Sequence, residues 1–302
     1  MSNQADSVKS IFYALLANGA IAAAKLGAAF YTGSTALLAE AIHSLADCGN
    51  QGLLLLGLKR AQEPPSPDYP LGHGRAIYFW SFIVALILFS MGGLFSIYEG
   101  VHKLGSREPI NAPVLAVAIL VFSLVAEAFS LYGCLREVNK VRGQRNLWRW
   151  FRESRQSELI VVLGEDIAAL LGLGFALVAV GAAVFTGNPM YDALGSIMIG
   201  ALLILVAIAI GMEVKGLLIG QSAEPAEQEA IRQFIAGHPR VEQVLNLITV
   251  QLGQELMVAV KAKMRESQNA GTLIDDINAT EDALQAAFPA VRWVFFEPDT
   301  VD

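Results

Sequence analysis

The sequence predicts an α-helical membrane protein with six transmembrane helices followed by a small α+β domain of order αββαβ. The 302 residues are 54% hydrophobic and only 16% charged, with a mean hydropathy of +0.49, whereas a soluble domain carries about 25% charged residues. The apolar residues gather in six stretches long enough to cross a bilayer, and the composition turns polar and acidic after Lys215. Lipid must therefore cover the first part of the chain.

Turn signals separate several of the six apolar stretches. Because a spanning helix needs roughly 20 mostly apolar residues, we expect helices at residues 11–31, 35–58, 77–101, 112–135, 158–185 and 191–217. Gly33-Ser34, the proline-rich run 63–70 and Gly187-Asn188-Pro189 mark turns between them. The second and fifth stretches carry acids near their middles, which makes them less apolar and marks them as functional.

The distribution of lysine and arginine predicts the orientation. With the N-terminus inside, twelve of these residues lie in inner segments, and only Lys103 and Arg107 lie in outer loops. Cytoplasmic loops carry the excess of Lys and Arg, so both termini are expected in the cytoplasm. The basic loop 136–155 either anchors its neighbouring helices in this way or also contacts anionic lipid headgroups.

Residues 221–302 are predicted to form a cytoplasmic domain that follows a transmembrane domain of residues 1–220. Residues 224–237 have the pattern of an amphipathic helix, and the β-rich runs 241–252 and 255–264 flank Gly253-Gln254, a hairpin signal. A second helix is expected at 272–288 and a last strand at 291–297. With His238 as its one histidine and no cysteine, this domain is not expected to need metal.

Ionisable side chains at membrane depth predict the functional site. The second stretch carries Glu40, His43 and Asp47, of which the last two lie four residues apart on one helical face. An imidazole nitrogen and a carboxylate oxygen at this spacing can bind one divalent cation such as Zn²⁺, and a buried His–Asp hydrogen bond is the alternative. The fifth stretch adds Glu165 and Asp166, adjacent acids with no base nearby in that stretch, which need a cation or protons between them.

We therefore expect a divalent metal site between the second and fifth stretches. Adjacent residues diverge by about 100° around a helix, so Asp166 is the expected direct ligand, and Glu165 stays open between ligand, supporting group and proton carrier. Glu127 in the fourth stretch is a further candidate. Asn18 and Lys25 are expected to make helix–helix hydrogen bonds and to extend toward the membrane surface. Close helix packing is expected at four glycines: Gly92, Gly93, Gly172 and Gly174.

Five segments in a fixed order carry a resemblance to a known family. They are TGSTALLAEAIHSLADCGNQ in the second stretch, PLGHGRAIYFW entering the third, EDIAALLGLG in the fifth, GNPMYDALGSIMIGALL in the sixth, and a tail that contains FFEPD. Together they resemble the cation diffusion facilitators, a family of metal–proton antiporters that includes zinc transporters. The resemblance covers nearly the whole chain, and the pair of Glu165 and Asp166 makes it most similar to the zinc transporter 9 type branch.

The resemblance implies a transport site with two ligands from each of the second and fifth helices. His43, Asp47 and Asp166 fall on three of these positions, whereas the fourth falls on Val162, which cannot bind metal. Glu165, Glu127 or water would then complete the site.

The resemblance also implies features outside this site. A second family site, weak or absent here, would lie around Asp68 and His73, and a metal cluster of the cytoplasmic domain is reduced to Glu297 and Asp299. The family further implies a homodimer in which the cytoplasmic domains pair.

The expected function is export of a divalent transition metal, first Zn²⁺, from the cytoplasm in exchange for protons. An ordinary imidazole has a pKa near 6.5, so protons and metal would compete for His43. No thiol lines up with His43 and Asp47, which argues against Cu(I) and leaves Fe²⁺, Co²⁺, Mn²⁺ and Ni²⁺ as alternative cargoes.

Other functions are less well supported by the sequence. A non-transporting membrane scaffold is the alternative, and an intramembrane metalloenzyme is disfavoured because no HExxH pairing is present. No enzymatic activity, cofactor or nucleic-acid partner is expected. Besides the metal ion and protons, the expected partners are membrane lipid and a second copy of the chain, and the expected location is the bacterial inner membrane.

Overall fold

The computed structural model describes residues 18–105, 110–266 and 269–301, and the chain divides into two compact units. The first unit holds the chain up to Leu56 together with Trp80–Arg145 and Glu158–Glu213, and the second holds Gly57–Phe79, Asn146–Ser157 and Val214–Asp302. This division follows packing in space and not the order of the sequence. The domains at 1–220 and 221–302 therefore stay a prediction.

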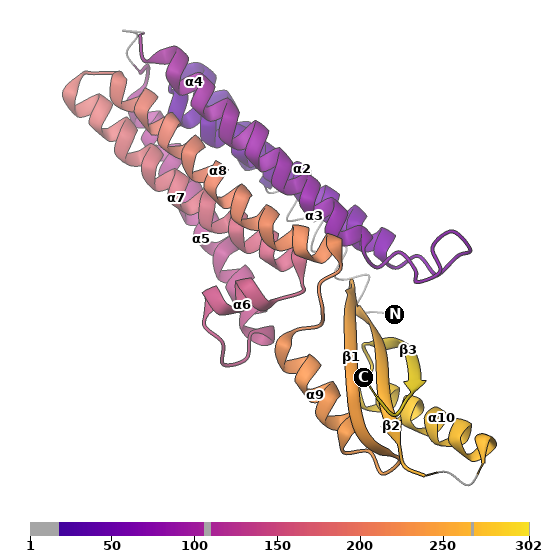
Figure 1. The fold of residues 1–302 in the computed structure, drawn as a ribbon. Coiled ribbons are helices and arrows are strands. Elements are labelled where there is room, and N and C mark those ends of the chain that lie inside the picture. Colours follow the sequence, from indigo (N-terminus) through magenta and orange to yellow (C-terminus); the bar gives the residue numbers. More distant parts are fainter. Residues whose placement is uncertain (1–17, 106–109, 267–268, 302) are drawn as a thin grey trace. The chain divides into compact units, whose positions relative to one another are not determined.

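Long helices make up the first unit (Figure 1). Residues 18–32 are helical, and the predicted start of this helix, residues 11–17, lies outside the described residues. The later helices match the predicted stretches closely: α2 (Thr35–Ala61), α3 (Ala76–Ile87), η1 (Leu88–Leu94), α4 (Phe95–Lys103), α5 (Pro113–Val141), α7 (Ser157–Thr186) and α8 (Met190–Ile219).

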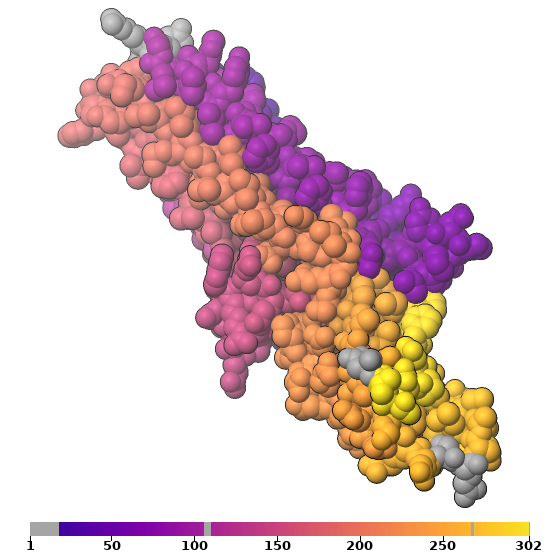
Figure 2. Space-filling model, viewed as in Figure 1, coloured from indigo at the N-terminus to yellow at the C-terminus, as the bar shows by residue number. Residues whose placement is uncertain are grey.

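Four helical segments of the described chain are long and apolar enough to cross a membrane: Ala76–Lys103, Pro113–Val141, Ser157–Thr186 and Met190–Ile219. Large apolar side chains on them are exposed, such as Phe185 (93%) and Val114 (82%), and such surfaces suit lipid rather than water. In Figure 2 the side chains of α7 and α8 form one continuous outer surface. The chain is therefore an integral membrane protein with a helical membrane part.

Glycines bring the helical segment Ala76–Lys103 close to α8. This segment contains η1, a π-helical turn that the sequence did not predict. A Cβ at Gly93 would collide with Ile204, and one at Gly200 would collide with the carbonyl oxygen of Gly93. The expectation of close packing is thus confirmed for Gly93, whereas it is wrong for Gly174, whose Cβ position has no atom within 4 Å.

The C-terminal part of the second unit is a three-stranded sheet with two helices. Its elements follow the predicted order αββαβ: α9 (Pro225–Ala236), β1 (Val241–Leu252), β2 (Glu255–Met264), α10 (Ala270–Ala287) and β3 (Val291–Pro298). The strand order is β1-β2-β3, with β1 antiparallel and β3 parallel to β2. Gly253, at φ +70°, makes the hairpin turn, a conformation that glycine adopts without strain.

One apolar core holds this sheet and its helices together. Ile231 and Ile235 of α9, Val258 and Val260 of β2 and Leu284 of α10 are each at most 2% exposed and belong to it. Because the side chains of a strand alternate between its two faces, alternate residues of β2 reach this core.

The basic loop after α5 is partly helical, which the sequence did not predict. Residues Leu147–Glu153 form α6, and the Asn146 side chain caps it by accepting a hydrogen bond from the Arg149 backbone N–H at 2.7 Å. Trp148 is 70% exposed whereas Trp150 is buried. Within the second unit, Arg155 Nε donates a hydrogen bond to the Ser222 carbonyl oxygen at 2.7 Å. This arginine therefore tethers the loop to the chain segment that leads into α9.

Candidate functional site

The helix α2 presents a row of polar side chains to the interior of the first unit. His43 Nε2 lies 3.5 Å from Asp47 Oδ2, as their four-residue spacing predicts. Both imidazole nitrogens of His43 and Oδ1 of Asp47 are buried and have no hydrogen-bond partner in the described part of the chain. Buried polar groups are nearly always satisfied, so these atoms are available to a ligand.

A carboxylate of α8 fixes the beginning of α2. Asp192 is 1% exposed, and its two oxygens accept hydrogen bonds from Ser34 Oγ at 2.6 Å, the Thr35 backbone N–H at 2.6 Å and Thr35 Oγ1 at 2.9 Å. The free N–H groups and the dipole of a helix N-terminus favour a carboxylate at this place. Asp192 lies in one of the family-like segments, but only the structure shows that it positions α2.

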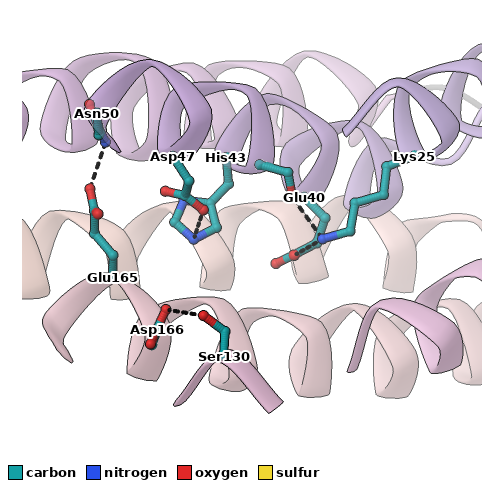
Figure 3. A network of polar contacts seen from close by, with 9 residues as sticks. Lys25, Glu40, His43, Asp47, Asn50, Ser130, Glu165 and Asp166 are labelled. Atoms are coloured by element: carbon teal, nitrogen blue, oxygen red, sulfur yellow. Dashed lines mark hydrogen bonds and ion pairs between the residues drawn. The ribbon is translucent and has the colours of Figure 1, made fainter. Parts of the chain in front are cut away.

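The helix α7 supplies the two adjacent acids, and they have different partners (Figure 3). Glu165 Oε1 accepts a hydrogen bond from Asn50 Nδ2 of α2 at 2.6 Å. Asp166 Oδ1 accepts one from Ser130 Oγ of α5 at 3.2 Å, while its Oδ2 is buried and unpartnered among the described residues. Asp166 keeps a free oxygen for a cation, whereas Glu165 is tied to α2 through Asn50, a residue that the sequence analysis missed.

A small cavity of about 20 Å³ lies between these helices. Four carboxylic acids line it, namely Asp47, Glu127, Glu165 and Asp166. A space of this size holds about one water molecule, which is also the scale of one metal ion. Its remaining lining residues include Asn18, Ser44, Ser130 and Val162.

The structure places Asp47, Glu127, Glu165 and Asp166 around one cavity, but it does not bring them together with His43 as a formed metal site. Within the described ranges, no group of three or more His, Cys, Asp or Glu side chains is arranged to hold a metal ion. His43 is not one of the lining residues, and its Nε2 lies 3.5 Å from Oδ2 of Asp47, which is. Asp166 is 8% exposed and faces this cavity, not lipid. The assignment of His43, Asp47, Glu165, Asp166 and Glu127 as ligands stays a prediction.

Lys25 corrects one expectation from the sequence. It was expected to extend toward the membrane surface, but its side chain is completely buried. Its Nζ donates a hydrogen bond to Ser44 Oγ at 2.7 Å and lies 3.6 Å from Glu40 Oε2. A buried carboxylate one turn before His43 is the partner that the sequence analysis did not consider.

The second candidate site, in the second unit, is poorly equipped for metal. Asp68 is exposed, and His73 packs its ring against Tyr69 with the centroids 4.4 Å apart. His73 Nδ1 is buried without a hydrogen-bond partner in the described chain. Near the C-terminus, Lys261 Nζ contacts Asp299 Oδ2 at 3.0 Å and supplies the positive charge beside that carboxylate.

Apolar helices with acidic side chains around a small cavity are typical of membrane proteins that move cations. Residues 11–219 match the family described as the cation efflux transmembrane domain. Because this match covers more than half of the chain, the chain belongs to the cation efflux family, as its resemblance to the cation diffusion facilitators predicted.

Several characterised proteins are similar to the chain. The proton-coupled zinc antiporter SLC30A9, mitochondrial, of Homo sapiens is 34% identical over 247 residues, which are 81% of this chain and 44% of that protein. Metal tolerance protein C4 of Arabidopsis thaliana is 29% identical over 83% of this chain and 55% of its own length. The cation-efflux pump FieF of Escherichia coli is 26% identical over 80% of this chain and 76% of its own length.

These similarities bear on the predicted branch and the predicted location. The similarity to SLC30A9 agrees with the predicted zinc transporter 9 type branch. The chain spans less than half the length of that antiporter. Because several similar proteins are named as mitochondrial, the comparison gives no support to the predicted bacterial inner membrane.

Proposed function

We propose that the chain is a secondary transporter that exports a divalent transition metal, first Zn²⁺, in exchange for protons. The observation that carries this proposal is the small cavity lined by Asp47, Glu127, Glu165 and Asp166. Four acids at this depth need protons or a cation. The named activities of the relatives, zinc–proton antiport and cation efflux, have the same chemistry.

The proposed ligands are His43, Asp47 and Asp166, with Glu165 or Glu127 in support. An imidazole nitrogen and carboxylate oxygens suit Zn²⁺ in a tetrahedral site, with ligand distances of roughly 2.0–2.2 Å. Asp166 lies on α7 and accepts a hydrogen bond from Ser130 of α5. If α2 and α7 closed on the ion, Asp166 would move toward the His43–Asp47 pair of α2. The missing ligand at Val162 would be replaced by Glu165, Glu127 or water.

Protons and metal would compete for the same atoms. A histidine nitrogen or a carboxylate oxygen that holds a proton cannot coordinate an ion, so binding metal releases protons and binding protons releases metal. If α2 and α7 move against the other helices, the site opens to each side in turn. This cycle couples outward metal movement to inward proton movement.

The architecture proposed for this activity has six spans, with both termini in the cytoplasm. The helical residues 18–32 and α2 would supply the two spans beyond the four apolar segments. α2 is less apolar because it carries Glu40, His43 and Asp47, as a helix that lines a cation path must. Two copies of the chain would associate through their C-terminal domains.

Counterflow in proteoliposomes tests this proposal. The full chain is reconstituted, a pH gradient is imposed, and uptake is measured for Zn²⁺, Fe²⁺, Co²⁺, Mn²⁺ and Ni²⁺. Zn²⁺ uptake that depends on the pH gradient, with matching proton movement, is the expected result. Uptake equal to that of empty vesicles for every ion would favour the scaffold function and reject transport.

A further inference from the structure

A buried ion pair lies beside the candidate metal site and has no role in the mechanism above. Lys25 Nζ lies 3.6 Å from Glu40 Oε2 and donates a hydrogen bond to Ser44 Oγ at 2.7 Å (Figure 3). The side chains of Lys25 and Glu40 are both 0% exposed. Charged groups inside a membrane domain are costly and are usually kept for function.

The geometry of this pair is not that of an ion pair kept for stability. The separation of 3.6 Å is too long for a good hydrogen bond. Neither carboxylate oxygen of Glu40 has a hydrogen-bond partner within the described chain. A buried ion pair compensates for its loss of hydration only when it is close and fully hydrogen-bonded. The Glu40 carboxylate therefore has oxygens that can still bind a cation.

The Glu40 carboxylate lies next along α2 from the candidate metal site. Glu40 precedes Asp47 by seven residues, which is about two helical turns or about 10 Å along one face. Ser44, which binds Lys25, also lines the cavity that holds Asp47. The row of polar groups therefore continues from the cavity to Glu40, toward the end of α2 opposite to Lys59 and Arg60.

The helix α7 leaves room for the Glu40 carboxylate. A Cβ added at Gly172 would collide with Glu40 Oε1. A glycine at this position therefore allows the carboxylate to sit between α2 and α7, the two helices that carry the candidate ligands.

We propose that Glu40 is a second, transient cation site on the transport path, occupied by the Lys25 ammonium whenever no metal ion is there. This inference rests on the proposed metal transport. A divalent ion that arrives at Glu40 displaces the ammonium from the carboxylate. A site with one carboxylate binds the ion weakly enough to release it onward, as conduction through successive sites requires.

The uncharged double variant Lys25→Met/Glu40→Gln tests this inference on the reconstituted full chain. It removes both charges together, so it leaves no unpaired buried charge that would unfold the bundle. We expect Zn²⁺ flux to fall at least about tenfold, a change of about 1.4 kcal/mol in the barrier. Equilibrium Zn²⁺ binding in detergent, which reports the candidate site at His43 and Asp47, is expected to stay within about threefold of the wild type.

The result that overturns the inference is a double variant with wild-type flux, because the pair would then be only structural. If the wild-type chain itself moves no metal, the proposed function fails instead, so the two failures are distinguishable.

A glycine pair provides a second test that leaves every charge in place. Gly172→Ala is expected to push the Glu40 carboxylate aside and to lower Zn²⁺ flux. Gly174→Ala, two residues along the same helix, meets no atom within 4 Å and is expected to transport like the wild type. Equal flux in both variants would contradict a role for the Glu40 position.

Discussion

The two acidic regions of the molecule satisfy their charges in opposite ways. In the C-terminal domain, acids are paired with bases: Asp276 with Arg240 at 3.1 Å, Asp299 with Lys261 at 3.0 Å and Glu242 with Lys263 at 2.7 Å. In the helix bundle, Asp47, Glu165 and Asp166 surround a cavity, and oxygens of Asp47 and Asp166 have no hydrogen-bond partner in the described chain. Buried acids without partners indicate a site for a mobile cation, whereas acids that are paired with bases do not.

The largest effect is expected when one acid is removed from each region. Asp47→Ala or Asp166→Ala leaves the cation with too little negative charge, and we expect Zn²⁺ flux to fall at least about a hundredfold. Asp299→Ala, the matched control in the C-terminal domain, is expected to keep flux within about twofold. Initial rates of uptake into vesicles check both expectations. Equal losses for the two kinds of variant would show that the position of the acid is irrelevant.

A change in the type of ligand at position 43 is expected to alter the metal preference. His43→Asp keeps a divalent site but makes it entirely oxygen-based, so preference should shift from Zn²⁺ toward Mn²⁺ by about tenfold. Proton competition should persist in altered form, because an ordinary aspartate has a pKa near 4 instead of near 6.5. The measurement is flux of each ion as a function of pH. An unchanged metal preference and pH profile would make His43 a structural hydrogen-bond partner.

A smaller effect is expected from the paired acid of the C-terminal domain. The hydrogen bond from Lys261, followed by those from the backbone N–H groups of Thr300 and Val301, lowers the pKa of Asp299. A carboxyl with a depressed folded-state pKa contributes stability above its unfolded pKa and loses it as pH falls through the folded value. Asp299→Asn should therefore lower the melting temperature slightly at pH 7, and the difference should vanish in strong acid. A difference that grows with acidity would reverse this assignment.

The smallest expected effect is that of metal removal on the C-terminal domain. Its core of Ile231, Val258 and Leu284 is apolar and already buried, so residues 222–302 should fold without metal. Thermal unfolding followed by circular dichroism is expected to be the same with and without a chelator. A marked rise in melting temperature with trace zinc would show that Glu297 and Asp299 retain a metal site.

The sequence predicted most of the elements, because their signals are local. Long apolar stretches placed α7 and α8 within two residues at each end, and the β-rich runs on either side of Gly253 placed β1 and β2. The short helix α6 was missed because its arginines suggested a loop, and the π-helical turn η1 has no simple local signal. The η1 turn contains Gly92 and Gly93, which pack closely against Leu203 and Ile204 of α8.

Helical periodicity predicted the contact between His43 and Asp47, and the acids Asp47, Glu127, Glu165 and Asp166 line one cavity. What the sequence could not provide was their partners on other helices. Asn50 bonds to Glu165, Ser130 to Asp166 and Lys25 to Ser44, and each of these contacts depends on how two helices are turned toward each other. Lys25 was misjudged for the same reason, because a lysine in a span extends to the surface unless a buried acid lies within reach.

The attachment of α2 to Asp192 has a geometric consequence. The first turn of α2 is fixed to α8 by the bonds at Ser34 and Thr35. If α2 tilts, it therefore rotates about that end. At 1.5 Å per residue, His43 lies about 12 Å and Asp47 about 18 Å from Thr35. Any tilt of α2 therefore displaces Asp47 about one and a half times as far as His43, so a single small rotation changes the opening between the two side chains and the facing acids unequally.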